Sequence, residues 1–144
     1  MSNNDIFKLI HTIELFTNET LIKWNKSFPY SLGISPILVL RELQRNGPKK
    51  QTELAALIGY TPGAMTNISN KLIKLGFAER KYNKEDRRIV YLGITEKGVE
   101  VLAEAQQKGL ELRMKIFEPL DEEEIKQFLK IHEKLLNKMN ESDF

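Results

Sequence analysis

The sequence contains no cysteine, which excludes disulfide bonds, zinc sites built on thiolates and sensing through thiol oxidation. Histidine is also scarce, since the chain has only 2, and this leaves little capacity for acid–base catalysis. The residue order shows no Ser/His/Asp arrangement, no phosphate-binding glycine loop and no pair of catalytic carboxylates. We therefore expect a protein that is not an enzyme and that carries neither a cofactor nor a metal ion.

Long apolar runs are missing as well. No segment approaches the roughly 18 uninterrupted apolar residues of a membrane span, and the N-terminus lacks the basic and apolar parts of a signal peptide. The 144 residues are 41% hydrophobic and 29% charged, a balance typical of a globular chain that buries its own core. These features predict a soluble, cytoplasmic protein with no membrane partner.

An excess of one charge is nearly absent from the whole chain, whose formal net charge is +2. The distribution is uneven, however, because residues 1–40 carry a net charge of 0, residues 41–94 of +6 and residues 95–144 of −4. A basic middle between neutral and acidic ends favours contact with a polyanion. A face of solvated lysines would give the same pattern, so charge alone leaves both interpretations open.

Helical periodicity is strong at both ends of the chain. Apolar residues at helical spacing predict a first helix over residues 5–27. A fifth helix is predicted over 96–117, and a sixth begins after Asp121, which is spaced with Glu124 as a capping box. The apolar stripe of the sixth helix extends to Met139.

Shorter helices are predicted between these. Ser35 is expected to cap the second helix with Pro36 at its first position, and the turn at residues 46–48 ends it. The third helix covers about residues 51–58.

The fourth helix has a distinctive exposed face. Thr61 is its expected N-cap, Pro62 takes the first position, and Gly76 ends it after about Leu75. One face is apolar and suits a core, whereas the other is small, polar or basic throughout. That second face, here called the recognition face, consists of Gly63, Thr66, Asn67, Asn70, Lys71 and Lys74.

After Gly76 the apolar pattern changes from helical to alternating. Residues 77–82 and 89–94 are predicted to form two strands, joined by a tip at residues 83–88 that is dense in charge. The order of helix, turn, helix and hairpin predicts a mainly α fold with a small β-hairpin, a winged helix-turn-helix with long N- and C-terminal helices. The fourth helix would fit a major groove about 12 Å wide, and arginine at the hairpin tip would suit a narrow minor groove.

Five short motifs follow one another between about Gly47 and Gly98. They are Glu53-Leu54-Ala55, Leu72 through Gly76-Phe77, Glu79-Arg80, Asp86-Arg87-Arg88 and Ile94-Thr95-Glu96-Lys97-Gly98. Their order and spacing resemble the multiple-antibiotic-resistance-regulator (MarR) family of bacterial transcription factors. The resemblance implies a homodimeric, ligand-responsive repressor that binds a pseudo-palindromic site on double-stranded DNA. The chain departs from the family where Lys50 replaces a common Thr or Ser, and where Asn67 replaces a common Arg, which suggests adenine rather than guanine as the preferred base.

Two sets of residues are predicted to contact DNA. On the fourth helix they are Thr61, Pro62, Gly63, Thr66, Asn67, Asn70, Lys71 and Lys74. On the hairpin they are Lys84, Asp86, Arg87 and Arg88. The resemblance implies that Arg88 enters the minor groove and that Asp86 orients it, although Asp86 could also simply stiffen the hairpin by pairing with Arg88.

The same resemblance implies a division of roles along the chain. Residues 1–34 and 96–144 would form a helical dimerisation region, and residues 35–95 the DNA-binding lobe. A small aromatic or phenolic effector would bind between the two parts, and the candidate pocket residues are His11, Trp24, Phe28 and Tyr30. For the three aromatic residues, however, the sequence favours core or dimer packing, and the effector pocket is the alternative role.

Two other functions stay open from the sequence. A metal-sensing winged-helix repressor could use His11, Glu14 and His132, and a metal titration by calorimetry would reveal it. A winged-helix module that binds protein would use the basic hairpin as a docking surface, and its partner complex would be insensitive to salt.

Overall fold

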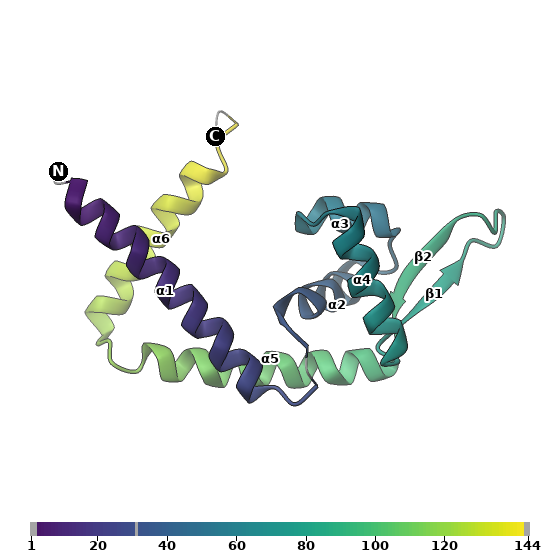
Figure 1. Cartoon of the computed structure of the whole chain (residues 1–144), viewed down its shortest axis with the longest axis horizontal. Coiled ribbons are helices and arrows are strands. Elements are labelled where there is room, and N and C mark those ends of the chain that lie inside the picture. The colour runs from purple at the N-terminus through teal and green to yellow at the C-terminus, as the bar shows by residue number, and fades with distance from the viewer. Residues whose placement is uncertain (1–2, 31, 143–144) are drawn as a thin grey trace. The chain divides into compact units, whose positions relative to one another are not determined.

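The computed structural model describes residues 3–30 and 32–142 of the chain. Its helices are α1 (Asn3–Ser27), α2 (Ile34–Asn46), α3 (Gln51–Ile58), α4 (Pro62–Lys74), α5 (Glu96–Phe117) and α6 (Glu122–Met139), and its strands are β1 (Ala78–Tyr82) and β2 (Val90–Ile94) (Figure 1). The predicted fold class, mainly helical with one antiparallel hairpin, is confirmed. No helix among the described residues is long and apolar enough to cross a membrane.

The chain divides into two compact units, Met1–Gly109 and Leu110–Phe144. The first unit contains α1 to α4, the hairpin and the larger part of α5, whereas the second contains the end of α5 and all of α6. This division follows compactness. The predicted division by role, with residues 35–95 as the DNA-binding lobe, stays a prediction.

The core of the first unit is formed by apolar side chains from α2, α3, α4, β2 and α5. Its members include Val39, Leu40, Leu43, Leu54, Met65, Leu72, Leu92 and Leu102, each of them at most 3% exposed. Figure 1 shows α2, α3 and α4 gathered together, with the hairpin extending away from them. The face of α4 opposite to its buried residues is therefore left open to solvent.

The predicted cap of α2 is wrong. The helix begins at Ile34 with Gly33 as its N-cap, and no side chain caps it. The hydroxyl of Ser35 instead accepts a hydrogen bond of 2.7 Å from Tyr60 Oη. Pro36 consequently lies deeper in the first turn than predicted, where its missing N–H still costs nothing, because the first N–H groups of a helix have no helical partner.

The end of α4 is fixed by Gly76, as predicted. This glycine has φ 82°, a left-handed conformation that favours glycine. Its N–H donates to Ile73 O at 3.0 Å, and the N–H of Phe77 donates to Leu72 O at 2.9 Å. Together these bonds form a Schellman motif, which ends the helix and turns the chain into β1.

The hairpin pairs with one residue that the sequence did not reveal. Ala78 lies opposite Ile94 and Tyr82 opposite Val90 in the antiparallel ladder. In addition, Lys49 forms an isolated bridge to Leu92, with hydrogen bonds of 3.1 and 2.8 Å in the two directions. The connection between α2 and α3 is thereby joined to the hairpin.

The start of α5 is fastened to the end of α4. Thr95 Oγ1 donates to Gly76 O at 2.6 Å and accepts from the N–H of Gly98 at 3.0 Å. A Cβ added at Gly98 would collide with the backbone oxygen of Phe77. Only glycine permits this approach, so the short segment from Thr95 to Gly98 sets the position of the start of α5 against the end of α4.

Two helices leave large apolar surfaces uncovered within the chain. Along its whole described length, α6 has no buried residue, and α1 has only Trp24. The exposed apolar residues of α6 include Ile125, Phe128, Leu129, Leu135, Leu136 and Met139. Those of α1 include Phe7, Leu9, Ile10, Ile13 and Phe16.

Candidate nucleic-acid interface

The N-terminal turn of α4 is locally fixed and sterically open. Thr61 caps the helix as predicted, since its Oγ1 accepts from the N–H of Ala64 at 3.1 Å. Pro62 follows at the first helical position. A Cβ added at Gly63 would meet nothing within 4 Å, so none of the described residues requires a glycine there. Because Gly63 has no side chain, a ligand can closely approach the first turn of α4.

The recognition face is exposed as predicted. Thr66, Asn67, Asn70, Lys71 and Lys74 are all exposed. On the opposite side of α4 the buried residues are Met65, Ser69 and Leu72. Ser69 was not predicted in the core, and its Oγ has no hydrogen-bond partner within the described residues.

Thr66 is already committed to bonds within the protein. Its hydroxyl donates to Pro62 O at 2.9 Å, and it lies 3.4 Å from Nε2 of Gln51, the first residue of α3. Because the proton is used within the helix, Thr66 can offer a ligand only a lone pair and its methyl group. A methyl group suits contact with the methyl of thymine.

Asn70 is bonded to a residue outside α4. Arg80 of β1 donates from Nη2 to Asn70 Oδ1 at 3.0 Å. Gln51 and Arg80 also line one open groove of about 370 Å³ beside the hairpin. Neither residue was among the predicted site residues. The signal available for Arg80 was its alternation within β1, but nothing in the sequence indicated which face of the strand meets α4.

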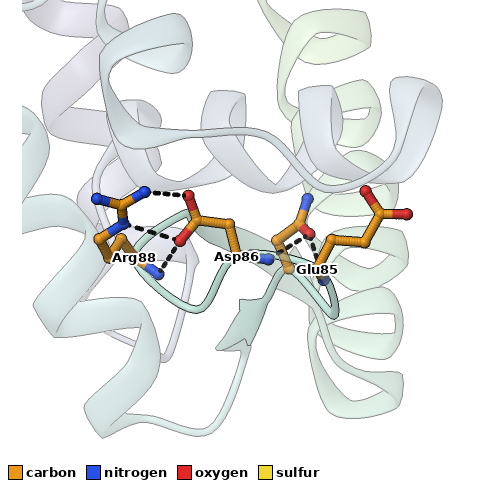
Figure 2. Close-up of polar contacts among 4 residues, drawn as sticks. Glu85, Asp86 and Arg88 are labelled. Carbon is orange, nitrogen blue, oxygen red and sulfur yellow. Dashed lines mark hydrogen bonds and ion pairs between the residues drawn. The ribbon is translucent and has the colours of Figure 1, made fainter.

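In the hairpin, hydrogen bonds to Asp86 hold the side chain of Arg88 in one orientation (Figure 2). Asp86 Oδ1 accepts from both the backbone N–H and Nε of Arg88 at 3.0 Å, and Oδ2 accepts from Nη2 at 2.9 Å. The Arg88 side chain is nevertheless 91% exposed. Asp86 therefore fixes the direction of a guanidinium group that remains free to meet a ligand.

This pair changes the acidity of both groups. The hydrogen bonds from the Arg88 side chain, and then from its backbone N–H, hold the pKa of the Asp86 carboxyl below its usual value. The bond to Asp86 raises the pKa of Arg88 in turn. Asp86 is thus ionised at neutral pH and is bonded to Arg88 in the form that orients it.

The loop that positions Asp86 depends on Asn83. Its Oδ1 accepts from the N–H of Glu85 at 2.8 Å and from that of Asp86 at 3.1 Å. Sequence reasoning missed this role, although an asparagine that begins a turn commonly bonds to the backbone a few residues further on. Lys84 and Arg87 of the same loop are exposed and add positive charge beside Arg88.

The four candidate effector residues do not form one cluster. Trp24 and Phe28 are buried and stack at 4.8 Å between ring centroids, and Tyr30 lies 5.3 Å from Phe28. A hydrogen bond with Glu104, and its negative charge, raise the pKa of Tyr30. His11 lies apart, because it precedes Trp24 by 13 residues on α1, or about 20 Å along a helix.

His11 instead faces Glu14, with 4.0 Å between Nδ1 and the carboxylate. Across the part of the chain that the structure describes, no group of three or more His, Cys, Asp or Glu side chains could hold a metal ion. The effector pocket stays a prediction, and of its four members the structure brings together only the three aromatic ones.

Known proteins resemble this chain in both sequence and structure. Residues 34–90 match the MarR family. The chain is 31% identical over 111 residues to the uncharacterized HTH-type transcriptional regulator YpoP of Bacillus subtilis. The matched residues make up 77% of this chain and 79% of YpoP. It is 30% identical over 106 residues to the transcriptional repressor MprA of Escherichia coli, covering 74% of this chain and 60% of MprA.

Among solved structures, a mutant MarR from E. coli complexed with operator DNA has the same fold, with a TM-score of 0.76. It shows 22% identity over 92% of this chain and 96% of that one. Together with the match to the MarR family and the likeness to YpoP, the helix-turn-helix and its hairpin lead to one assignment. The chain belongs to the MarR family of HTH-type transcriptional regulators.

Proposed function

We propose that this regulator binds a pseudo-palindromic operator as a homodimer, with one recognition face in the major groove of each half-site. The observation that carries the proposal is the exposed polar and basic face of α4 beside a hairpin whose Arg88 is oriented by Asp86. The fold shared with a MarR protein complexed with operator DNA supports it.

Within this interface the residues divide by chemistry. Lys71 and Lys74 lie in the last turn of α4 and would contact phosphates, which fix position but carry little sequence information. Thr66 and Asn67 would read base edges. The absence of a side chain at Gly63 would let the first turn of the helix approach the groove closely. Arg88 would enter the minor groove, where a narrow groove concentrates negative potential.

The uncovered apolar faces of α1 and α6 support the homodimer. The family resemblance gives the dimerisation role to residues 1–34 and 96–144, which include both faces, so we propose that a second copy covers them. Symmetric oligomers are most often two-fold, and a two-fold axis would present two recognition faces to the two half-sites of one operator.

We propose a cytoplasmic, non-enzymatic repressor that a small aromatic or phenolic effector releases from DNA. The name of its relative MprA, a transcriptional repressor, supports repression. The aromatic cluster of Trp24, Phe28 and Tyr30 supports an effector site at the end of α1, with Tyr30 as its most accessible ring.

The decisive experiment is selection of DNA by the purified protein from a random pool, followed by titration of the selected site at several salt concentrations. With roughly 6–10 phosphate contacts per dimer, affinity should fall about 10³- to 10⁵-fold between 50 and 200 mM salt. A pool that yields no preferred sequence, or a flat salt response, would instead favour a winged-helix module that binds protein.

A further inference from the structure

Arg80 lies outside the recognition face but is bonded to it. The residue belongs to β1, and its Nη2 donates to Oδ1 of Asn70 on α4 at 3.0 Å. Both side chains are exposed. The bond therefore does not serve to satisfy a buried polar group, and it lies where solvent or a ligand can reach it.

The chemistry of the two groups decides which end of the amide faces the strand. A guanidinium group has N–H donors and no acceptor, whereas an amide has a carbonyl oxygen at one end and an NH₂ group at the other. Only the carbonyl oxygen of Asn70 can bond to Arg80, and this holds whichever way the amide would turn by itself. The NH₂ group of Asn70 is consequently directed away from the strand.

We propose that Arg80 is a positioning residue that makes Asn70 a donor-only reader of DNA, an inference that rests on the proposed function. In the major groove guanine presents two adjacent acceptors, N7 and O6, to such a donor. Adenine presents N7 next to an amino group that itself donates, and the fixed NH₂ group of Asn70 has no acceptor to offer that amino group. Asn70 should therefore prefer guanine.

Asn67 provides an internal comparison on the same face. Among the described residues no bond holds its amide, so the group can turn to donate to N7 of adenine and accept from N6. Two asparagines of one helix are thus expected to read different bases. The difference between them is the hydrogen bond from Arg80.

The test compares sites selected by the wild-type protein and by single variants, then measures affinities for sites that differ at one base pair. The base pair read by Asn70 is the one at which Asn70→Ala loses its preference. There, Arg80→Met should lower the preference for guanine over adenine by about fivefold or more, because the freed amide can turn. Arg80→Lys keeps a donor and the charge, and should retain the preference for guanine.

Lys81→Met is the matched control. It removes the same charge from the next residue of β1, whose side chain leaves the opposite face of the hairpin and pairs with Glu79 at 3.8 Å. This variant should weaken binding to all sequences alike and leave base preference unchanged. In the Asn70→Ala background, Arg80→Met should likewise have no further effect on base preference.

Two results would overturn the positioning role. In one, Arg80→Met selects the rest of the site normally and also keeps the wild-type preference for guanine over adenine at the base pair that Asn70 reads. In the other, Asn70→Ala weakens all sequences equally, which would place Asn70 on phosphate. Failure of the proposed function looks different, since the wild-type protein would then select no sequence at all.

Discussion

At the scale of single residues, Asp86 poses a conflict between charge and geometry. It adds a negative charge to a surface that is proposed to face DNA, yet it fixes the guanidinium group of Arg88. Ordering a free arginine side chain costs up to about 2 kcal/mol of rotamer entropy. We expect Asp86→Ala to weaken DNA binding by about three- to tenfold, measured by fluorescence titration at fixed salt.

Glu85 supplies the matched control for this change. It lies beside Asp86 in the same loop, and its side chain points away from Arg88 (Figure 2). Glu85→Ala removes the same charge without releasing the arginine, so it should bind DNA slightly more tightly than the wild type. If Asp86→Ala also binds more tightly, Asp86 acts only through its charge and does not orient Arg88.

The acidity of Asp86 gives a second prediction at this scale. Its pKa is lowered by the bonds from Arg88, so the pair contributes stability above the usual carboxyl pKa and loses it as the pH falls through the lowered value. At neutral pH the pair is intact. An NMR titration of the Asp86 carboxyl carbon should show a midpoint below its usual value, and Arg88→Ala should move that midpoint upward. An unchanged midpoint in the variant would mean that Arg88 is not the cause.

At the scale of elements, local sequence patterns were enough to predict most helices, but they did not predict the contacts between elements. The bounds of α3 and α5 agree with the predicted ranges 51–58 and 96–117. Local signals account for the end of α3, at the left-handed Gly59, and for the start of α5, where Thr95 accepts from the N–H of Gly98. The predicted cap at Ser35 was wrong because the helix begins one residue before it, at Ile34, and the hydroxyl of Ser35 instead bonds to Tyr60, which is distant in sequence. The contact between Arg80 and Asn70 joins two elements, so no local pattern in the sequence could reveal it.

Gly98, near the start of α5, shows how one element positions another. At Gly98 a methyl group would collide with the backbone of Phe77, whereas at Gly63 it would meet open space. Gly98→Ala should lower the free energy of unfolding by roughly 1–3 kcal/mol, measured by chemical denaturation. Gly63→Ala, as the control, should raise it by up to about 1 kcal/mol, because alanine favours the helix. Equal effects would argue against close packing at Gly98.

At the scale of the whole molecule, charge and apolar surface are separated along the chain. The net charge of +6 falls on residues 41–94, which hold α4 and the hairpin, whereas α1 and α6 carry the large uncovered apolar faces. Exposed apolar surface of this extent commonly marks an interaction site. DNA binding and assembly are thus proposed for different parts of one chain, and binding to a two-fold operator would require both.

Assembly is tested by placing a charge on the uncovered face of α6. Leu129 is 57% exposed within the chain, so Leu129→Glu should leave the subunit folded, but in a dimer it would bury an unpaired charge. We expect the wild type to sediment as a dimer at micromolar concentration and Leu129→Glu to sediment as a monomer. The affinity of Leu129→Glu for the operator should also fall, because each monomer reaches only one half-site. Lys130→Glu changes the charge of the neighbouring exposed position and should remain dimeric. A wild-type monomer, or a Leu129→Glu variant that stays dimeric, would show that this face does not join the two subunits.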